Sequence, residues 1–197
     1  MATLERKLSE AAKWGFAPEI SSLLKDNPAL NANWANENHW TALHWATYKG
    51  HVDAVKLFLG HSSVRVNIRN KDGYSPFLLA CMNGHVTAVQ LMLKDARIDV
   101  TLTDNNGCSP LWYAACTGKQ EVVEWLIASG RDLGDISNAK GKQFGKEFTA
   151  IEIAKKDLRP EVVALLERFV ANPTQTRLQI RDNLQFPGPF FGRCRGF

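Results

Sequence analysis

The chain has 197 residues, which is enough for one ordinary domain or one short repeat array. Apolar residues make up 45% of it and charged residues 22%, so its composition is that of a folded, soluble protein and not of a disordered one. The formal net charge is +4, of which +3 lies in residues 172–197, and such a nearly neutral body argues against a nucleic-acid binder.

The first 20 residues have no secretory pattern, because they contain Glu5, Glu10 and Lys13 and no apolar core segment. No run approaches the ~18 apolar residues that a transmembrane helix needs. The cysteines form no CxxC pair, and reduced thiols are the simpler interpretation of Cys81, Cys108, Cys116 and Cys194. We therefore expect a cytoplasmic or nuclear protein without a transmembrane segment.

A six-residue pattern recurs along the chain and divides it into units. TALHWA at residues 41–46 returns as SPFLLA at 75–80, SPLWYA at 109–114 and TAIEIA at 149–154. The first three copies start 34 residues apart, and the last follows after 40. A glycine stands four residues after each of the first three copies, and an apolar cluster comes next, in which we expect Leu91 and Leu126 to be buried.

Each unit predicts two short helices. The leading Ser or Thr is an N-cap, since its hydroxyl can accept a free amide of the first turn. Pro76 and Pro110 stand at the first helical position, where a missing N–H costs nothing. Gly50, Gly84 and Gly118 end the first helix by taking a left-handed conformation. A polar, turn-rich link then leads into the next unit.

The repeat array is expected to span residues 3–171. In chain order its units are 3–36, 37–70, 71–104, 105–144 and 145–171. The first is an atypical capping unit, aligned with the second at an offset of 35, and Pro18 opens its second helix. In the fifth unit Leu158 replaces the expected glycine, so we expect a different turn there. The insertion at residues 134–146 predicts an enlarged, floppy hairpin loop.

Residues 172–197 form a C-terminal tail beyond the array. Asn172 and Pro173 indicate one more short helix to about Leu184. The remaining residues have glycines and prolines too close together for a helix or a strand, and we expect them to be disordered or loosely docked. A chain that ends at Ala171 is therefore expected to keep its stability.

The units resemble ankyrin repeats, whose period is about 33 residues and whose signature is T-P-L-H-x-A. The resemblance covers roughly residues 3–171 and includes the family's Gly-His-Val at 50–52 and 84–86. It implies an all-α solenoid of helix–turn–helix repeats linked by β-hairpin-like loops. It also implies a non-catalytic, monomeric interaction module or adaptor that binds a protein or peptide.

No pattern in the sequence points to catalysis or to a cofactor. His44, His51 and His85 occupy signature positions and are expected to make structural hydrogen bonds, and neither the histidines nor the cysteines have the spacing of metal ligands. The glycines of residues 141–147 are three residues apart and no Ser or Thr follows the lysine, so they do not form a phosphate loop. We expect no enzyme activity, metal or cofactor.

The resemblance places two variable positions of each repeat on the concave face, where partners of this family dock. The position before the N-cap holds Trp40 and Tyr74, and the two before the glycine hold Tyr48-Lys49 and Met82-Asn83. Aromatic residues are the commonest binding hot spots, so we predict one continuous binding strip. The competing interpretation is packing between repeats. The aromatic residues at positions that the family buries are expected in the core: Trp45, Trp112, Tyr113 and Trp125.

The alternative function is the binding of an acidic partner, nucleic acid or anionic lipid. It would use the basic loop at residues 140–146, with Lys140, Lys142 and Lys146, together with the arginines of the tail. Nucleic acid is the less favoured of these partners because the body of the chain is nearly neutral.

Overall fold

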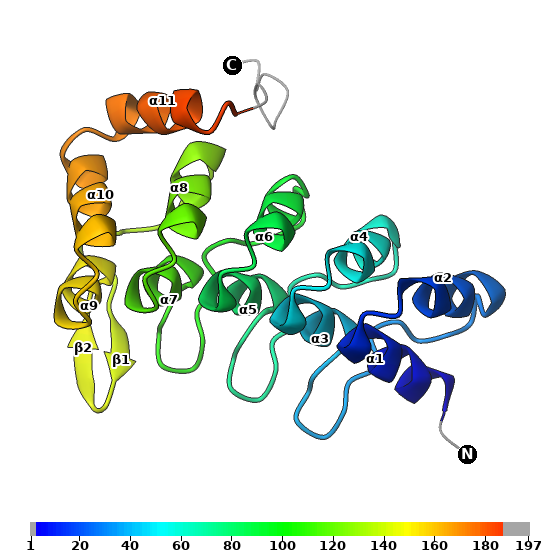
Figure 1. Cartoon of the computed structure of the whole chain (residues 1–197). Coiled ribbons are helices and arrows are strands. Elements are labelled where there is room, and N and C mark those ends of the chain that lie inside the picture. The colour runs from blue at the N-terminus through cyan, green and yellow to red at the C-terminus, as the bar shows by residue number, and fades with distance from the viewer. Residues whose placement is uncertain (1–2, 187–197) are drawn as a thin grey trace, which may run out of the picture.

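The computed structural model describes residues 3–186. Within them the helices come in consecutive pairs that stack along the chain, as Figure 1 shows. This arrangement confirms the predicted all-α solenoid of helix pairs. The elements are α1 Leu4–Trp14, α2 Ala17–Asp26, α3 Ala42–Lys49, α4 Val52–Gly60, α5 Pro76–Asn83, α6 Val86–Leu93, α7 Pro110–Cys116, α8 Gln120–Ser129, β1 Gly141–Gln143, β2 Lys146–Phe148, α9 Ala150–Lys156, α10 Pro160–Ala171 and α11 Pro173–Asn183.

The pairs form two layers of helices. The first helices of the pairs pack in the order α1, α3, α5, α7, α9, and the second helices in the order α2, α4, α6, α8, α10. The loops before α3, α5 and α7, and the β1–β2 hairpin before α9, extend from the first layer (Figure 1). We call the surface formed by this layer and these loops the inner face. The core lies between the layers and includes Phe58, Phe77 and Leu126, all fully buried.

The helix starts confirm the predicted caps. The hydroxyls of Thr41, Ser75, Ser109 and Thr149 each accept a hydrogen bond from the backbone N–H three residues later. Each bond satisfies one of the amides that a helix leaves without a partner in its first turn. The recurring hexamer is therefore a helix-starting device, which explains why it fixes the spacing of the repeats.

The ends of the first helices show why glycine recurs there, and why the last repeat can do without it. Gly50 has a φ of 73°, and a Cβ atom on it would overlap the ring of His85 in the next repeat. Leu158 takes the same left-handed conformation, with a φ of 56°, so the expectation of a different turn was wrong. Within residues 3–186 no further repeat follows this one, so the Leu158 side chain meets no ring like that of His85. The leucine therefore costs only its backbone strain, about 1–2 kcal/mol.

Two signature side chains join neighbouring repeats through the same type of bond. The buried His44 Nε2 donates to the carbonyl of Tyr74 at 3.0 Å, while its Nδ1 accepts from the Thr41 N–H at 3.2 Å. Two repeats later Trp112 stands at the His44 position, and its Nε1 donates to the carbonyl of Phe148 at 2.8 Å. These bonds fix the distance between adjacent repeats on the inner face.

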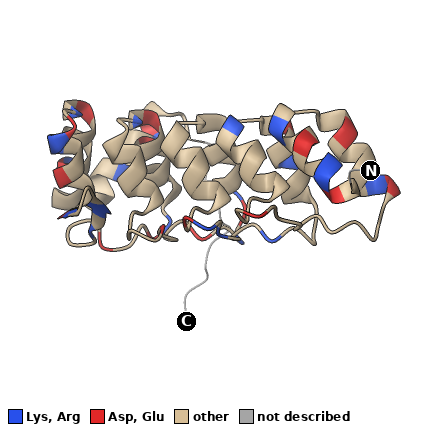
Figure 2. Ribbon diagram, turned by 90° about the horizontal axis from the view of Figure 1, so that it is seen from below, with Lys and Arg blue, Asp and Glu red and all other residues tan. Residues whose placement is uncertain are grey.

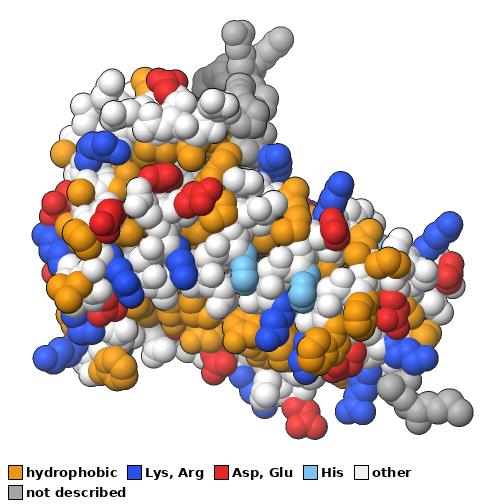
Figure 3. All heavy atoms as spheres, viewed as in Figure 1, with side chains coloured by type: hydrophobic (Ala, Val, Ile, Leu, Met, Phe, Trp, Pro, Cys, Tyr) orange, Lys and Arg blue, Asp and Glu red, His pale blue; other side chains and the backbone are white. Residues whose placement is uncertain are grey.

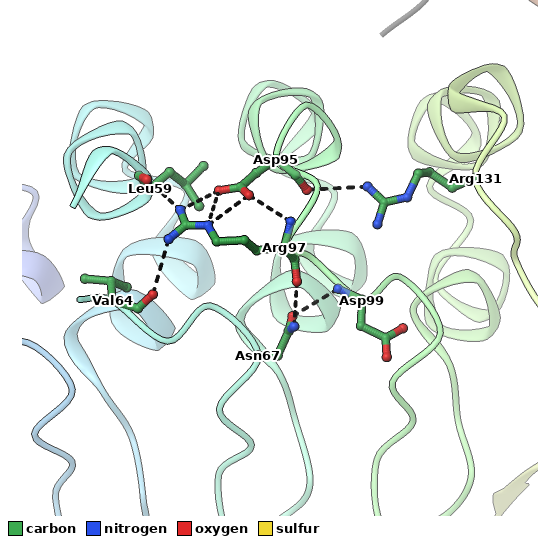
Figure 4. A network of polar contacts seen from close by, with 7 residues as sticks. All are labelled: Leu59, Val64, Asn67, Asp95, Arg97, Asp99 and Arg131. Atoms are coloured by element: carbon green, nitrogen blue, oxygen red, sulfur yellow. Dashed lines mark hydrogen bonds and ion pairs between the residues drawn. The ribbon is translucent and has the colours of Figure 1, made fainter. Parts of the chain in front are cut away.

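On the other side of the stack, polar side chains link the loops that follow the second helices (Figure 4). Asn67 donates from Nδ2 to the carbonyl of Arg97 at 2.7 Å and accepts from the N–H of Asp99 at 3.0 Å. Arg97 donates to the carbonyl of Leu59 at 2.6 Å and pairs with Asp95. The hydrogen bond from Arg97 holds the pKa of the Asp95 carboxyl below its ordinary value. The network holds the repeats in register.

The helix predicted after residue 171 is present, and it packs against α8 and α10. α11 crosses the ends of α8 and α10 (Figure 1). Arg177 Nε donates to the carbonyl of Ile127 at 3.0 Å, Arg181 Nε donates to that of Ala128 at 2.7 Å, and Ile180 is buried. The packed structure thus continues beyond residue 171. The predicted disorder of the last residues lies outside the described residues.

This docking reverses the expectation for a shortened chain. A chain that ends at Ala171 is expected to lose about 2 kcal/mol of unfolding free energy, because Ile180 leaves the core and the end of α8 loses two hydrogen-bonded arginines. Chemical denaturation of that chain and of one ending at Phe186, which keeps α11, measures the difference. Equal midpoints for the two chains would contradict the capping role of α11.

Candidate functional site

The inner face of the first two repeats carries a cluster of aromatic side chains. The ring centroid of Trp40 lies 4.4 Å from that of Trp45 and 5.4 Å from that of Tyr48. All three side chains are half-buried, so each is anchored on one side and open to solvent on the other. Lys13 of α1 places its Nζ 5.2 Å from the Trp45 ring and 5.4 Å from that of Trp14. We call Trp14, Trp40, Trp45 and Tyr48 the aromatic cluster.

Local helix chemistry accounts for part of this cluster. Trp40 precedes the N-cap Thr41, and Trp45 is the fourth residue of α3, so their contact is a hydrophobic staple that fixes the entry of the chain into the helix. Tyr48 lies three residues after Trp45 and therefore on the same side of α3. The staple gives Trp40 a structural role, whereas no cap or staple requires an aromatic residue at Tyr48 or Trp14.

A groove of about 1010 Å³ opens beside the cluster, between α1 and the loop that leads to α3. Trp14 is 60% exposed and Phe16 is 55% exposed, so large apolar side chains line an accessible surface. Figure 3 shows hydrophobic side chains grouped with Lys and Arg side chains along this part of the molecule. The groove also has Trp34, Trp45 and charged residues of both signs in its walls: Arg6, Lys7, Glu10, Lys13, Glu19 and Glu37.

The six residues predicted to bind a partner fall into two groups. Trp40, Tyr48 and Lys49 lie together, with Lys49 Nζ 5.2 Å from the Tyr48 ring. Tyr74 turns to the following repeat, where its ring lies 5.9 Å from that of Tyr113 and their hydroxyls are 3.4 Å apart. The predicted strip is therefore divided by the direction of the Tyr74 side chain.

The two remaining predicted residues, Met82 and Asn83, lie at the end of α5, in the same repeat as Tyr74. Asn83 donates from Nδ2 to the carbonyl of Leu79 at 2.8 Å within its own helix. The carbonyl of Met82 accepts a hydrogen bond from the Thr117 hydroxyl at 3.2 Å, and its side chain is half-buried. The Asn83 hydrogen bond stays within α5, whereas the backbone carbonyl of Met82 joins this repeat to the next one through the Thr117 hydroxyl.

Two residues expected in the core are only half-buried. Trp112 and Trp125 are buried as predicted, but Trp45 and Tyr113 reach the inner face. The Tyr113 hydroxyl donates to the buried Asp104 at 2.9 Å, and burial raises the pKa of Tyr113 well above its ordinary value. Tyr113 is thus a neutral, hydrogen-bonded part of the surface.

Burial keeps two of the described cysteine thiols, Cys108 and Cys116, protonated at neutral pH. Burial, followed by a hydrogen bond to Asp157, raises the pKa of the Cys116 thiol to about 11, and burial raises that of Cys108 to about 12. Protonated thiols are poor nucleophiles and poor metal ligands. Within residues 3–186 no group of three His, Cys, Asp or Glu side chains is placed to hold a metal ion, and no helix is long and apolar enough to cross a membrane.

Positive and negative side chains are mixed along the stack. Figure 2 shows Lys and Arg interspersed with Asp and Glu along most of the stack. An extended face of one sign, which nucleic acid would require, is not visible in that view. The site therefore offers aromatic area, a groove and a few charges, which are the components of a recognition surface.

Comparison with known proteins agrees with the observed architecture. A family model described as ankyrin repeats, in three copies, matches residues 7–70 and 62–137. The two segments together cover more than half of the chain. A search of curated proteins gave no match. With its helix pairs, capped hexamers and left-handed glycines, the chain belongs to the ankyrin-repeat family.

Proposed function

We propose that this ankyrin-repeat protein is a non-catalytic interaction module that binds a protein or peptide through the aromatic cluster and the adjoining groove. Ankyrin repeats are generally protein-interaction modules, and the family is typically non-catalytic. The observation that carries the proposal is an open groove of about 1010 Å³ beside the aromatic cluster, two of whose four side chains, Trp14 and Trp45, line the groove. A monomer in the cytoplasm or nucleus is part of the same proposal.

The physical basis is a preformed surface. Staple, caps and inter-repeat hydrogen bonds hold Trp40, Trp45 and Tyr48 in place before a partner arrives, so little conformational entropy is lost on binding. Rings that are half-buried present a flat apolar side and keep a polar edge accessible. Such aromatic anchors contribute most of the binding energy in many interfaces.

The test replaces the two aromatic residues that have no cap or staple role. The double change Trp14→Ser with Tyr48→Ser is expected to weaken partner binding by about 2 kcal/mol, roughly thirtyfold in Kd. Its cost in unfolding free energy is expected to stay below about 1 kcal/mol, because Trp14 is 60% exposed and Tyr48 is half-buried. Quantitative affinity capture from cell extract identifies the partner, and titration calorimetry with the captured protein then measures the change in Kd.

A matched control comes from the far side of the molecule. Val170 of α10 is 40% exposed, and Val170→Ser removes a comparably accessible apolar group away from the inner face. Its capture profile should equal that of the natural chain. If the double variant also binds normally while remaining folded, the groove is not the binding site; Tyr74 and Tyr113 then become the better candidates.

A further inference from the structure

The β1–β2 hairpin of the fifth repeat presents an unusual side chain at its tip. Phe144 is 92% exposed, which leaves it without groove walls around the ring. Gln143 pairs with Lys146, so Phe144 and Gly145 form a two-residue turn, and both have positive φ angles, 50° and 77°. Turns of this type favour Asn-Gly or Asp-Gly, because other side chains are strained at the first position.

Phe144 therefore carries two costs that its surroundings do not offset. Its backbone is strained, and a large apolar side chain is left in water. Its ring contact within the described residues is with Lys156 Nζ at 5.9 Å, which is a weak interaction at an exposed site. Asparagine would remove both costs, so the phenylalanine points to a contact with another molecule.

The base of the hairpin is fixed, which makes the tip a rigid projection. The N–H of Lys142 donates to the carbonyl of Asn106 in the preceding loop at 2.9 Å. The Cys108 thiol lies 3.6 Å from the carbonyl of Lys142, and a Cβ atom on Gly141 would overlap that sulfur atom. The predicted floppy loop is thus a paired hairpin held against its neighbour.

Positive charge surrounds the tip. Residues 140–159 contain six Lys or Arg and three Asp or Glu, while the rest of residues 1–171 has a small excess of acidic side chains. Lys142 and Lys146 stand on opposite strands, on either side of the turn, and both are exposed. Glu147 pairs with Lys142 at 3.8 Å, and Lys146 takes part in none of the ion pairs formed within residues 3–186. Figure 2 shows blue segments together with red ones at this end of the stack.

We propose that the hairpin tip docks on an anionic membrane surface, with the Phe144 ring in the interface and the lysines beside the lipid headgroups. A convex apolar tip needs no shaped pocket in a bilayer, whereas a peptide ligand would need a groove around the ring. Lysine stems can lie along the apolar boundary while their ammonium groups reach phosphate and carboxylate oxygens. One aromatic ring with a few lysines gives weak, reversible binding that salt reduces. The aromatic cluster, at the opposite end of the stack, remains free for a protein partner.

The experiment is co-sedimentation of the full chain with vesicles of phosphatidylcholine containing about 30 mol % phosphatidylserine, at low salt. The natural chain is expected to sediment with these vesicles and to stay in solution with vesicles of phosphatidylcholine alone. Phe144→Asn is expected to lower the vesicle partition coefficient about fivefold or more, and Phe144→Trp to retain it. The double change Lys142→Gln with Lys146→Gln is expected to give a similar loss.

Folding is separated from binding by the choice of variant. Phe144→Asn relieves the turn, so its melting temperature should equal or exceed that of the natural chain while its vesicle binding falls. Val170→Asn is the control, since it changes an exposed apolar residue of α10 and should bind vesicles normally. A natural chain that leaves the anionic vesicles unbound, or a Phe144→Asn variant that binds them equally well, overturns the proposal. Because the assay contains no protein partner, its result is independent of the proposed protein-binding function.

Discussion

Leu126→Ala is expected to lower the free energy of unfolding by about 3–5 kcal/mol, the largest effect of any change considered for this chain. Leu126 lies in α8, between the two layers, and is fully buried. Truncation removes apolar contacts and leaves a cavity that the surrounding helices cannot fill, because each helix is held on both sides by a neighbouring repeat. The loss should appear as a lower denaturation midpoint in urea, measured by circular dichroism.

Leu91→Ala provides the matched control in the preceding repeat. The sequence pattern predicts burial for both leucines, but Leu91 of α6 is only half-buried. The same chemical change there should cost less than half as much, since fewer contacts are lost. Equal losses at the two positions would mean that cavity formation between the layers is not what stabilises the array.

Acidification should destabilise the protein through His44. Burial lowers the pKa of His44 from its ordinary value near 6.5 to about 4 in the folded protein. Below pH 6.5 the unfolded chain therefore binds a proton that the folded chain does not, so the stability from this group is complete above pH 6.5 and is lost as the pH falls towards 4. The full loss amounts to about 3 kcal/mol.

His44→Leu separates this contribution from the titration of other groups. Leucine is already present at the equivalent position of the next repeat, Leu78, so the fold accepts it. The variant loses the hydrogen bond to the Tyr74 carbonyl and should be less stable at pH 7 by about 1–2 kcal/mol. Between pH 7 and pH 4 its unfolding free energy should decrease by about 3 kcal/mol less than that of the natural chain. Parallel pH curves for the two proteins would show that His44 is not the responsible group.

The sequence predicted the parts of the fold that local chemistry decides. A Ser or Thr such as Thr41 starts a helix wherever it stands before an apolar run, and a glycine such as Gly50 permits the left-handed turn that ends it. Both signals act within a few residues, so one chain is enough to recognise them. These local signals did not predict the left-handed conformation of Leu158, because the space for a side chain at that position depends on whether another repeat follows.

The docking of α11 depends on contacts over a long sequence distance. Arg177 and Arg181 bind carbonyl groups of α8, about 50 residues earlier, and no periodic pattern reveals such bonds. Ile180 supplies the apolar contact, but one buried isoleucine in a polar segment is a weak signal. The capping role of this helix therefore came only from the structure.

The candidate site was half predictable. The repeat positions of Trp40 and Tyr48 predict that they share one surface, and their rings lie 5.4 Å apart, while the direction of the Tyr74 ring depends on Tyr113 in the next repeat. Trp14 was overlooked, although the alignment of the first two units at an offset of 35 places it opposite Lys49. Phe144 gave no signal, since its strain and exposure follow from the pairing of the hairpin strands.

Site-specific photo-crosslinking in cells tests the central proposal most directly, because it records which surface touches a partner. A photoreactive phenylalanine derivative at the position of Tyr48, which is half-buried in the aromatic cluster beside Trp40, should give a discrete covalent adduct with one protein. The same group at the position of Val170, on the far side of α10, should give none. Adducts from position 170 with none from position 48 would contradict binding at the aromatic cluster, and so would unchanged affinity of the Trp14→Ser, Tyr48→Ser variant for the crosslinked protein.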